Sequence, residues 1–178
     1  MSVTDTIFDL IDMRSFSNLW YWIALAVTWS STSHWVLGVP FDMVLRARRK
    51  GGQAAEDLVT ITRVNVGRLM YIGREGGLIL AVLISFVLTS LALLGFWYRF
   101  EFAQAIFLLA FPLSIVGMKS LAAARAIERR LEQGDSDADT VARMLARHRF
   151  WVQVIGMMAI TVTAFYGMLQ NFHMSVFG

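Results

Sequence analysis

Four long hydrophobic runs, separated by polar and basic stretches, dominate the chain. They cover residues 19–39, 78–98, 102–122 and 150–172. Each approaches the roughly 20 residues that a helix needs to cross about 30 Å of hydrocarbon. Lipid offers no partners to backbone amides and carbonyls, so helices are the expected form. The pattern predicts an all-α, polytopic protein with four transmembrane helices, in which residues 1–178 form a single membrane domain.

The composition agrees with this pattern. Hydrophobic residues make up 57% of the chain and charged residues 16%, whereas soluble domains are nearer 45–50% apolar and about 25% charged. The sequence contains no cysteine. That absence excludes disulfides, thiolate metal sites, thiolate-bound iron–sulfur clusters and cysteine nucleophiles.

The basic residues gather on one side of the predicted membrane. Fourteen of the sixteen lysines and arginines lie in the connections 40–77 and 123–149 or, for Lys119, just before the second one. Only Arg14 and Arg99 lie elsewhere. Loops rich in Lys and Arg stay in the cytoplasm. We therefore expect both connections in the cytoplasm and both termini on the opposite side of the membrane.

The connection 123–149 predicts a cytoplasmic helical hairpin. Its first helix continues the third span to about Gly134, and its second helix runs into the fourth span. Ser136 and Asp139 have the spacing of a capping box for that second helix. The hairpin is either a charged link between two spans or a docking surface for a cytoplasmic partner.

The connection 40–77 is expected to hold two shorter helices. Pro40 suits the first turn of one helix, which the Gly51–Gly52 pair ends, and residues 54–71 predict an interfacial helix. Four basic side chains close the first helix: Arg46, Arg48, Arg49 and Lys50. They predict contact with anionic lipid headgroups, although positive-inside anchoring explains the same residues.

Two histidines are the candidate redox ligands. His34 lies inside the first hydrophobic run, and His148 precedes the fourth run on the same cytoplasmic side. A b-type haem needs two such axial ligands. However, the two positions differ in depth by roughly 10 Å at 1.5 Å per residue, and Trp35 is bulky. A histidine hydrogen-bonded to a serine or to the backbone is the simpler interpretation, so we expect no cofactor, with haem b as the alternative.

Small residues recur where helices could pack closely. Gly73 and Gly77 form a G-x-x-x-G motif at the entry to the second span. A second set lies on one face of the fourth span: Gly156, Ala159, Thr163 and Gly167. Small faces let helices approach closely. The spacing leaves open whether the partner is another helix of this chain or another subunit.

Catalytic motifs are missing from the sequence. No acidic residue lies inside a hydrophobic run, and no metalloprotease, serine-hydrolase or P-loop motif occurs. Pumps and coupled transporters place ionisable residues at depth in the membrane. We therefore expect that the protein is not an enzyme.

Two segments resemble a known group of proteins. These are "IDMRSFSNLWYWIALAVTWSSTSHWVLGVPFDMVLRAR" and "ARHRFWVQVIGMMAITVTAFYGMLQNF". They are similar to small four-span inner-membrane proteins of alphaproteobacteria, whose function is unassigned and some of which are labelled as Suf iron–sulfur assembly components. The resemblance implies a location in the bacterial inner membrane, which would place both termini in the periplasm, and it assigns no residue a role.

The expected function follows from these observations. We expect a non-catalytic accessory, assembly or stabilising subunit of a larger bacterial inner-membrane complex of energy conversion. The expected partners are other integral membrane subunits and anionic lipids, and not nucleic acid. A haem b-carrying electron-transfer subunit is the alternative, and a small channel or exporter is the second alternative.

Overall fold

The all-α class is confirmed. The computed structural model describes residue 16, residues 18–134 and residues 137–177, with the backbone alone for residues 171–177. These residues form six α-helices, one π-helical turn and a two-stranded hairpin. Three helical segments are long and apolar enough to cross a membrane: Gly77–Trp97, Glu101–Glu132 and Ala138–Gln170. These three segments support a multi-pass membrane protein.

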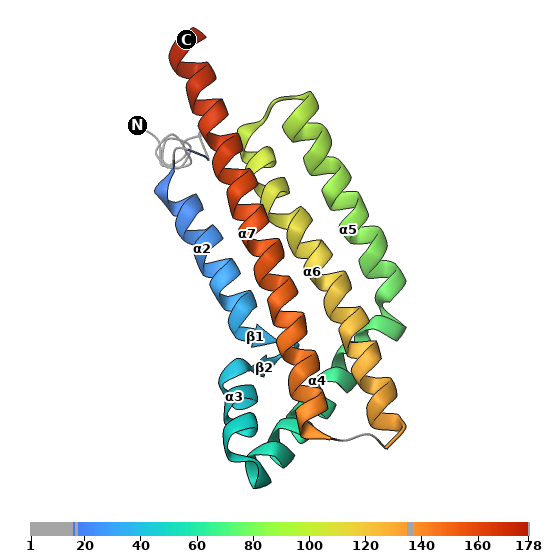
Figure 1. The fold of residues 1–178 in the computed structure, drawn as a ribbon. Coiled ribbons are helices and arrows are strands. Elements are labelled where there is room, and N and C mark those ends of the chain that lie inside the picture. The colour runs from blue at the N-terminus through green and yellow to red at the C-terminus, as the bar shows by residue number, and fades with distance from the viewer. Residues whose placement is uncertain (1–15, 17, 135–136, 178) are drawn as a thin grey trace, which may run out of the picture.

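Four helices run side by side along the long axis of the molecule (Figure 1). They are, in spatial order, α2 (Leu19–His34), α7 (Ala138–Phe177), α6 (Glu101–Glu132) and α5 (Gly77–Ala92). Two more helices, α3 (Phe41–Lys50) and α4 (Gly52–Glu75), lie at the lower end of this view, against α6 and α7.

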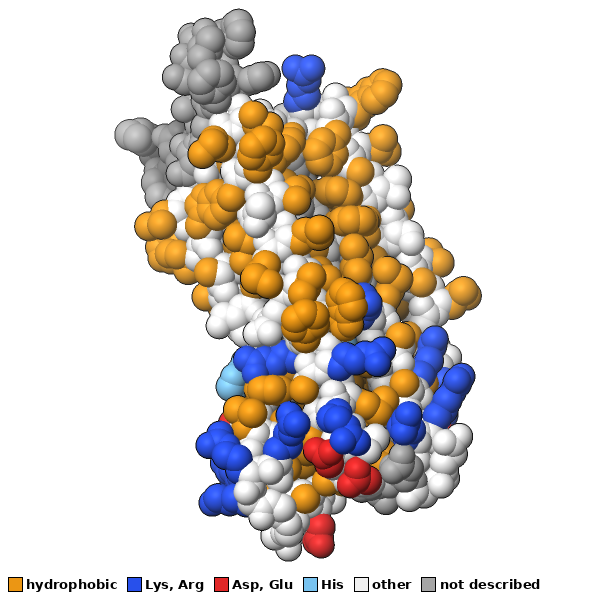
Figure 2. All heavy atoms as spheres, in the orientation of Figure 1, with side chains coloured by type: hydrophobic (Ala, Val, Ile, Leu, Met, Phe, Trp, Pro, Cys, Tyr) orange, Lys and Arg blue, Asp and Glu red, His pale blue; other side chains and the backbone are white. Residues whose placement is uncertain are grey.

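The surface divides along the same axis (Figure 2). Hydrophobic side chains cover the upper part of this face, whereas Lys and Arg side chains form a belt across the lower part. We call the lower part, residues 41–75, 119–132 and 138–149, the basic end. We call residues 19–34, 77–118 and 150–170 the apolar region.

The first helix is shorter than predicted. α2 ends at His34, so the prediction of a helix over 19–39 is wrong in its last five residues. The chain instead forms a tight hairpin, in which β1 (Trp35–Val36) pairs with β2 (Val39–Pro40). Asn65 of α4 donates a hydrogen bond of 3.0 Å from Nδ2 to the Gly38 carbonyl. The end of α2 is therefore tied to the basic end.

The basic end has a hydrophobic core of its own. Pro40 and Gly51 flank α3, as predicted. α4 buries Leu58, Thr62, Val66 and Met70, which are four residues apart and share one face of the helix. This face packs in one cluster with residues of α6 and α7, namely Ala124, Ile127, Val141, Ala142 and Leu145. The two helices expected in the connection 40–77 are therefore present, and both pack into this core.

A second core lies in the apolar region, where α2, α6 and α7 meet. Leu25 and Trp29 of α2 pack with Val116 of α6 and with Val152 and Ala159 of α7. By contrast, α5 buries none of its residues. α5 therefore lies at the edge of the bundle, in contact with α6 and with the end of α4.

A π-helical turn, Leu93–Trp97, joins α5 to the loop before α6. Gly95 in this turn lies so close to α6 that an added Cβ would be 3.0 Å from the backbone nitrogen of Gln104. Gln104 donates from Nε2 to the Gly95 carbonyl over 2.7 Å and accepts from Gln170 Nε2 over 3.1 Å. These bonds tie the upper ends of α5, α6 and α7 together.

α7 begins at a cap different from the predicted one. Ser136 lies outside the described residues. The Asp137 carboxylate accepts hydrogen bonds from the backbone nitrogen of Thr140 over 3.0 Å and from its hydroxyl over 2.7 Å. Asp139, the predicted partner of Ser136, instead forms ion pairs with Arg143 and, at 3.9 Å, with Arg48 of α3. The helix then runs unbroken into the fourth hydrophobic run, as predicted, and ends at Phe177, five residues beyond the predicted end of the span.

Candidate functional site

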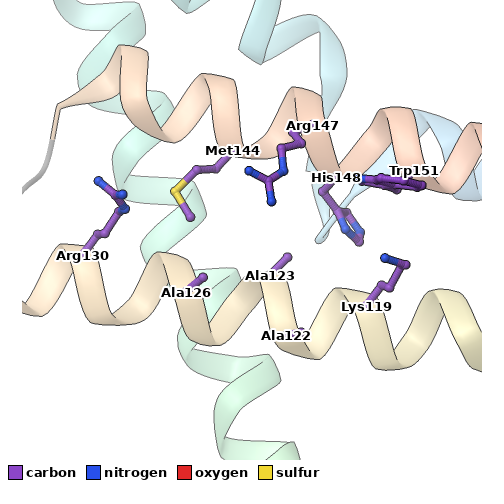
Figure 3. Close-up of a pocket in the computed structure, with 9 residues that line it drawn as sticks. All are labelled: Lys119, Ala122, Ala123, Ala126, Arg130, Met144, Arg147, His148 and Trp151. Carbon is purple, nitrogen blue, oxygen red and sulfur yellow. The ribbon is translucent and has the colours of Figure 1, made fainter.

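A groove of about 420 Å³ lies between α6 and α7, where the basic end meets the apolar region. Lys119 and Arg130 of α6 line it, together with Ala122, Ala123 and Ala126. Met144, Arg147, His148 and Trp151 of α7 form the opposite wall, and Figure 3 shows the long side chains facing across the space between the two helices. The groove thus gathers positively charged side chains over an alanine floor.

Helical spacing explains why these residues share one site. The α6 residues stand at i, i+3, i+4, i+7 and i+11 from Lys119, and the α7 residues stand at i, i+3, i+4 and i+7 from Met144. Residues with these spacings lie on one face of a helix. The three alanines leave room between the helices, while the longer residues at either end reach across.

His148 is buried in the wall of the groove. Its Nε2 lies 3.2 Å from the Ser120 hydroxyl oxygen. Ser120 already donates its proton to the Val116 carbonyl over 2.8 Å. The hydroxyl oxygen can therefore only accept from His148, which places the ring proton on Nε2. Nδ1 is then the ring nitrogen that can accept a hydrogen bond.

His148 lies in the basic end, two residues before the apolar run of α7. Burial lowers the pKa of His148, and the positive charge of Lys119 lowers it further. Both effects disfavour the imidazolium form. The ring is therefore neutral at pH 7, and the formal charges of the groove are those of its lysine and arginines.

Lys119 also closes one end of the groove. Its Nζ lies 4.7 Å from the centre of the Trp151 ring, which is within the range of a cation–π contact. None of the described residues that line the groove is acidic. The site therefore suits an anionic group.

The predicted pair of histidines occupies two different environments. His34 is exposed at the end of α2, and its ring packs edge-on against Trp35, with 5.9 Å between ring centres. It does not line the groove that contains His148. A haem held by His34 and His148 stays a prediction. No cluster of three or more His, Asp or Glu able to hold a metal occurs in the described part of the chain.

The four basic residues predicted to contact headgroups lie exposed on α3. Two of them have acidic partners. Arg46 lies 3.5 Å from Asp42, one turn earlier in the helix, and Arg48 pairs with Asp139 of α7. Arg49 and Lys50 are exposed at the end of the helix. Contact of this group with lipid stays a prediction.

The predicted small-residue face of α7 is covered by this chain itself. A Cβ added at Gly156 would come within 2.7 Å of Cε3 of Trp29, and one at Gly167 within 3.3 Å of Phe16. Between them, Ala159 and Thr163 are buried. The sequence left open whether this face packs against another helix of the same chain or against another subunit. In the structure it packs within the chain.

In the predicted G-x-x-x-G motif, only Gly73 lies at a close contact between helices. A Cβ at Gly73 would lie 2.8 Å from Cδ1 of Leu121, so α4 and α6 approach closely at this residue. Nothing lies within 4 Å of a Cβ built at Gly77. The groove between α6 and α7 was not predicted from the sequence, although the spacing of its residues was a usable signal.

Comparisons with protein-family models, with curated proteins and with solved structures find no match to this chain. The resemblance to alphaproteobacterial inner-membrane proteins therefore stays a prediction.

Proposed function

We propose that this protein is a non-catalytic accessory subunit that associates with a larger inner-membrane complex through α5. The observation that carries the proposal is the exposure of α5. Together with the π-helical turn that follows, this helix forms a segment long and apolar enough to span a membrane, and α5 itself buries none of its residues. The helix is thus available to a neighbour along most of its surface.

The residues of α5 favour a protein neighbour over lipid. Ala81, Ser85 and Thr89 follow one another at intervals of four residues, and all three are exposed. Small residues at this spacing let the backbone of a second helix approach closely, and serine and threonine hydroxyls can hydrogen-bond across the contact. Lipid acyl chains form no hydrogen bonds with these hydroxyl groups and have no backbone that the small residues would admit. The expected partner is a transmembrane helix of another subunit.

The orientation is part of the same proposal. We propose four spans, with α2 as the first and with the basic end in the cytoplasm. α2 has 16 residues and is therefore about 24 Å long. Local thinning of the bilayer and interfacial anchors can make up for a span that is shorter than the hydrocarbon thickness. The lower ends of α6 and α7 would then form the cytoplasmic hairpin. A channel or exporter gains no support from any specific observation.

The test of association compares two matched substitutions. Both Ala81→Leu on α5 and Ala164→Leu on α7 add the same bulk at exposed positions of apolar helices. Each variant is produced at native level in the cells that make the protein and extracted in mild detergent. Native gel electrophoresis then measures the size of the particle, and mass spectrometry identifies its subunits.

We expect the unsubstituted chain and Ala164→Leu to run in a particle larger than the single chain, with the same integral membrane partners. Ala81→Leu should run as the single chain, because the added leucine holds the partner helix away and forfeits close contacts. An unsubstituted chain that runs alone would refute the proposal. So would equal retention of partners by the two variants.

A further inference from the structure

We infer that the groove between α6 and α7 binds the phosphate of an anionic membrane phospholipid, with Lys119 and Arg147 as the residues that hold it. This site is distinct from the basic residues of α3 and from the exposed face of α5. The inference rests on three observations: the charges, the space and the depth of the groove.

The first observation is that the groove holds two positive side chains without acidic partners. Lys119 and Arg147 face the same groove from opposite helices (Figure 3). Neither has an acidic partner among the described residues, and no described lining residue is acidic. Like charges in one partly enclosed space repel, and a phosphate between them converts that repulsion into attraction. Arginine in addition presents a planar fork that matches two phosphate oxygens.

The space is of the right size for a headgroup. A volume of about 420 Å³ lies within the range of small-ligand sites. The floor consists of Ala122, Ala123 and Ala126, which add methyl groups but no polar atoms. A phosphate with its glycerol can therefore enter between the two basic side chains without displacing a larger residue.

The depth selects a lipid over free phosphate. Lys119 is the first charged residue after the uncharged stretch 102–118 of α6, and Trp151 lies in the first turn of the apolar run of α7. Tryptophan and lysine together are typical of the membrane–water interface. Figure 2 shows the apolar surface giving way to basic side chains at the boundary between the two regions. A lipid phosphate at this level places its acyl chains against the apolar region.

The test uses the purified full-length chain, stripped of lipid in a neutral detergent. Native mass spectrometry counts bound lipids as phosphatidylglycerol or phosphatidylcholine is added. The groove variant is Lys119→Gln with Arg147→Gln. The matched control is Arg63→Gln with Arg68→Gln, which removes the same charge from exposed positions of α4.

We expect the unsubstituted chain and the control to retain one phosphatidylglycerol more tightly than phosphatidylcholine. The groove variant should bind phosphatidylglycerol about tenfold more weakly, since each basic residue near a lipid surface contributes attraction. Equal losses in both variants would indicate a diffuse basic surface and would overturn the inference.

Two further arms complete the test. Ala126→Leu leaves every charge in place and narrows the floor, so it should weaken phosphatidylglycerol binding even where the charge variant folds poorly. In the second arm, inorganic phosphate replaces the lipid, and thermal unfolding is measured. Stabilisation by phosphate equal to that by phosphatidylglycerol would identify a free-anion site and overturn the assignment to lipid, as would unchanged lipid binding in Ala126→Leu.

Discussion

α2 and α7 approach each other closely where Trp29 meets Gly156. The Trp29 ring is 4% exposed and is held within the core of the apolar region. A Cβ at residue 156 would meet Cε3 of this ring at 2.7 Å and Cδ2 at 3.2 Å. Because the ring is rigid and enclosed, it has little room to give way.

We therefore expect Gly156→Ala to destabilise the protein, although alanine favours a helix over glycine. Overpacking in a filled core costs about 1–3 kcal/mol, which exceeds the gain in helix propensity of about 1 kcal/mol. The measurement is the thermal unfolding midpoint of the purified protein in detergent.

Gly117→Ala is the control for this prediction. Gly117 lies in α6, and a Cβ there would have nothing within 4 Å. This variant should unfold at or slightly above the midpoint of the unsubstituted chain. A Gly156→Ala variant as stable as Gly117→Ala would show that Trp29 can shift out of the way.

At this scale the sequence predicted the small face but not what covers it. The spacing of Gly156, Ala159, Thr163 and Gly167 indicates close approach of a helix. A small-residue face fits a helix of the same chain or of another subunit equally well. Trp29 lies more than 120 residues earlier in the chain, and nothing in the local pattern at either site connects the two.

The start of α7 is stabilised by residues that are close to one another in the sequence. The Asp137 carboxylate caps its first turn through Thr140. The side-chain and backbone hydrogen bonds from Thr140 lower the pKa of Asp137 below its ordinary value. A group with a lowered folded-state pKa stabilises the fold when ionised and loses this contribution as the pH falls through the lowered value.

We expect Asp137→Ala to lower the thermal unfolding midpoint near neutral pH, because the capped amide loses its acceptor. The deficit should stay constant down to about pH 4, the ordinary pKa of aspartate, and shrink below it as the carboxylate of the unsubstituted chain protonates. The measurement is the midpoint of both proteins at several pH values. A deficit that stays the same near pH 3 would show that ionisation of Asp137 contributes nothing.

The end of α2 shows what the local pattern misses. The end of α2 was predicted five residues too late because Trp35–Pro40 is almost entirely apolar and resembles the continuation of a span. Leu37 adopts a φ of 52°, which a leucine rarely does. The hydrogen bond from Asn65, a residue of α4, supports this turn. A contact between residues 27 positions apart leaves no trace in the local sequence.

In the molecule as a whole, two cores stand one above the other on the shared helices α6 and α7. The hydrophobic runs predicted the upper core because lipid demands long apolar helices. The lower core was missed because its apolar residues are spaced along helices with basic outer faces, which resemble interfacial helices until their partners are known. The groove was missed for the same reason, since it forms only when α6 and α7 pair.

The placement of the basic end in the cytoplasm is testable, because the chain contains no cysteine. Arg99 and Gln133 are exposed at opposite ends of α6. An impermeant thiol reagent on intact inner-membrane spheroplasts should label Arg99→Cys and leave Gln133→Cys unlabelled until the membrane is permeabilised. The two positions report on opposite sides of the same helix, so each serves as the control for the other. Labelling of Gln133→Cys alone would reverse the proposed orientation.

The core of the basic end joins residues that the ribosome makes at very different times. α3 and α4 bury Val44, Leu58 and Val66 against α6 and α7, yet α4 ends at Glu75 and α7 begins only at Ala138. At roughly 5–20 residues per second, the ribosome needs about 3–13 s to make the intervening chain. Throughout that interval the apolar faces of α3 and α4 have no cover from α7. Until then, the apolar faces of α3 and α4 must be covered by the bilayer surface or by a chaperone. The core of the basic end is complete only after the first part of α7 has been made.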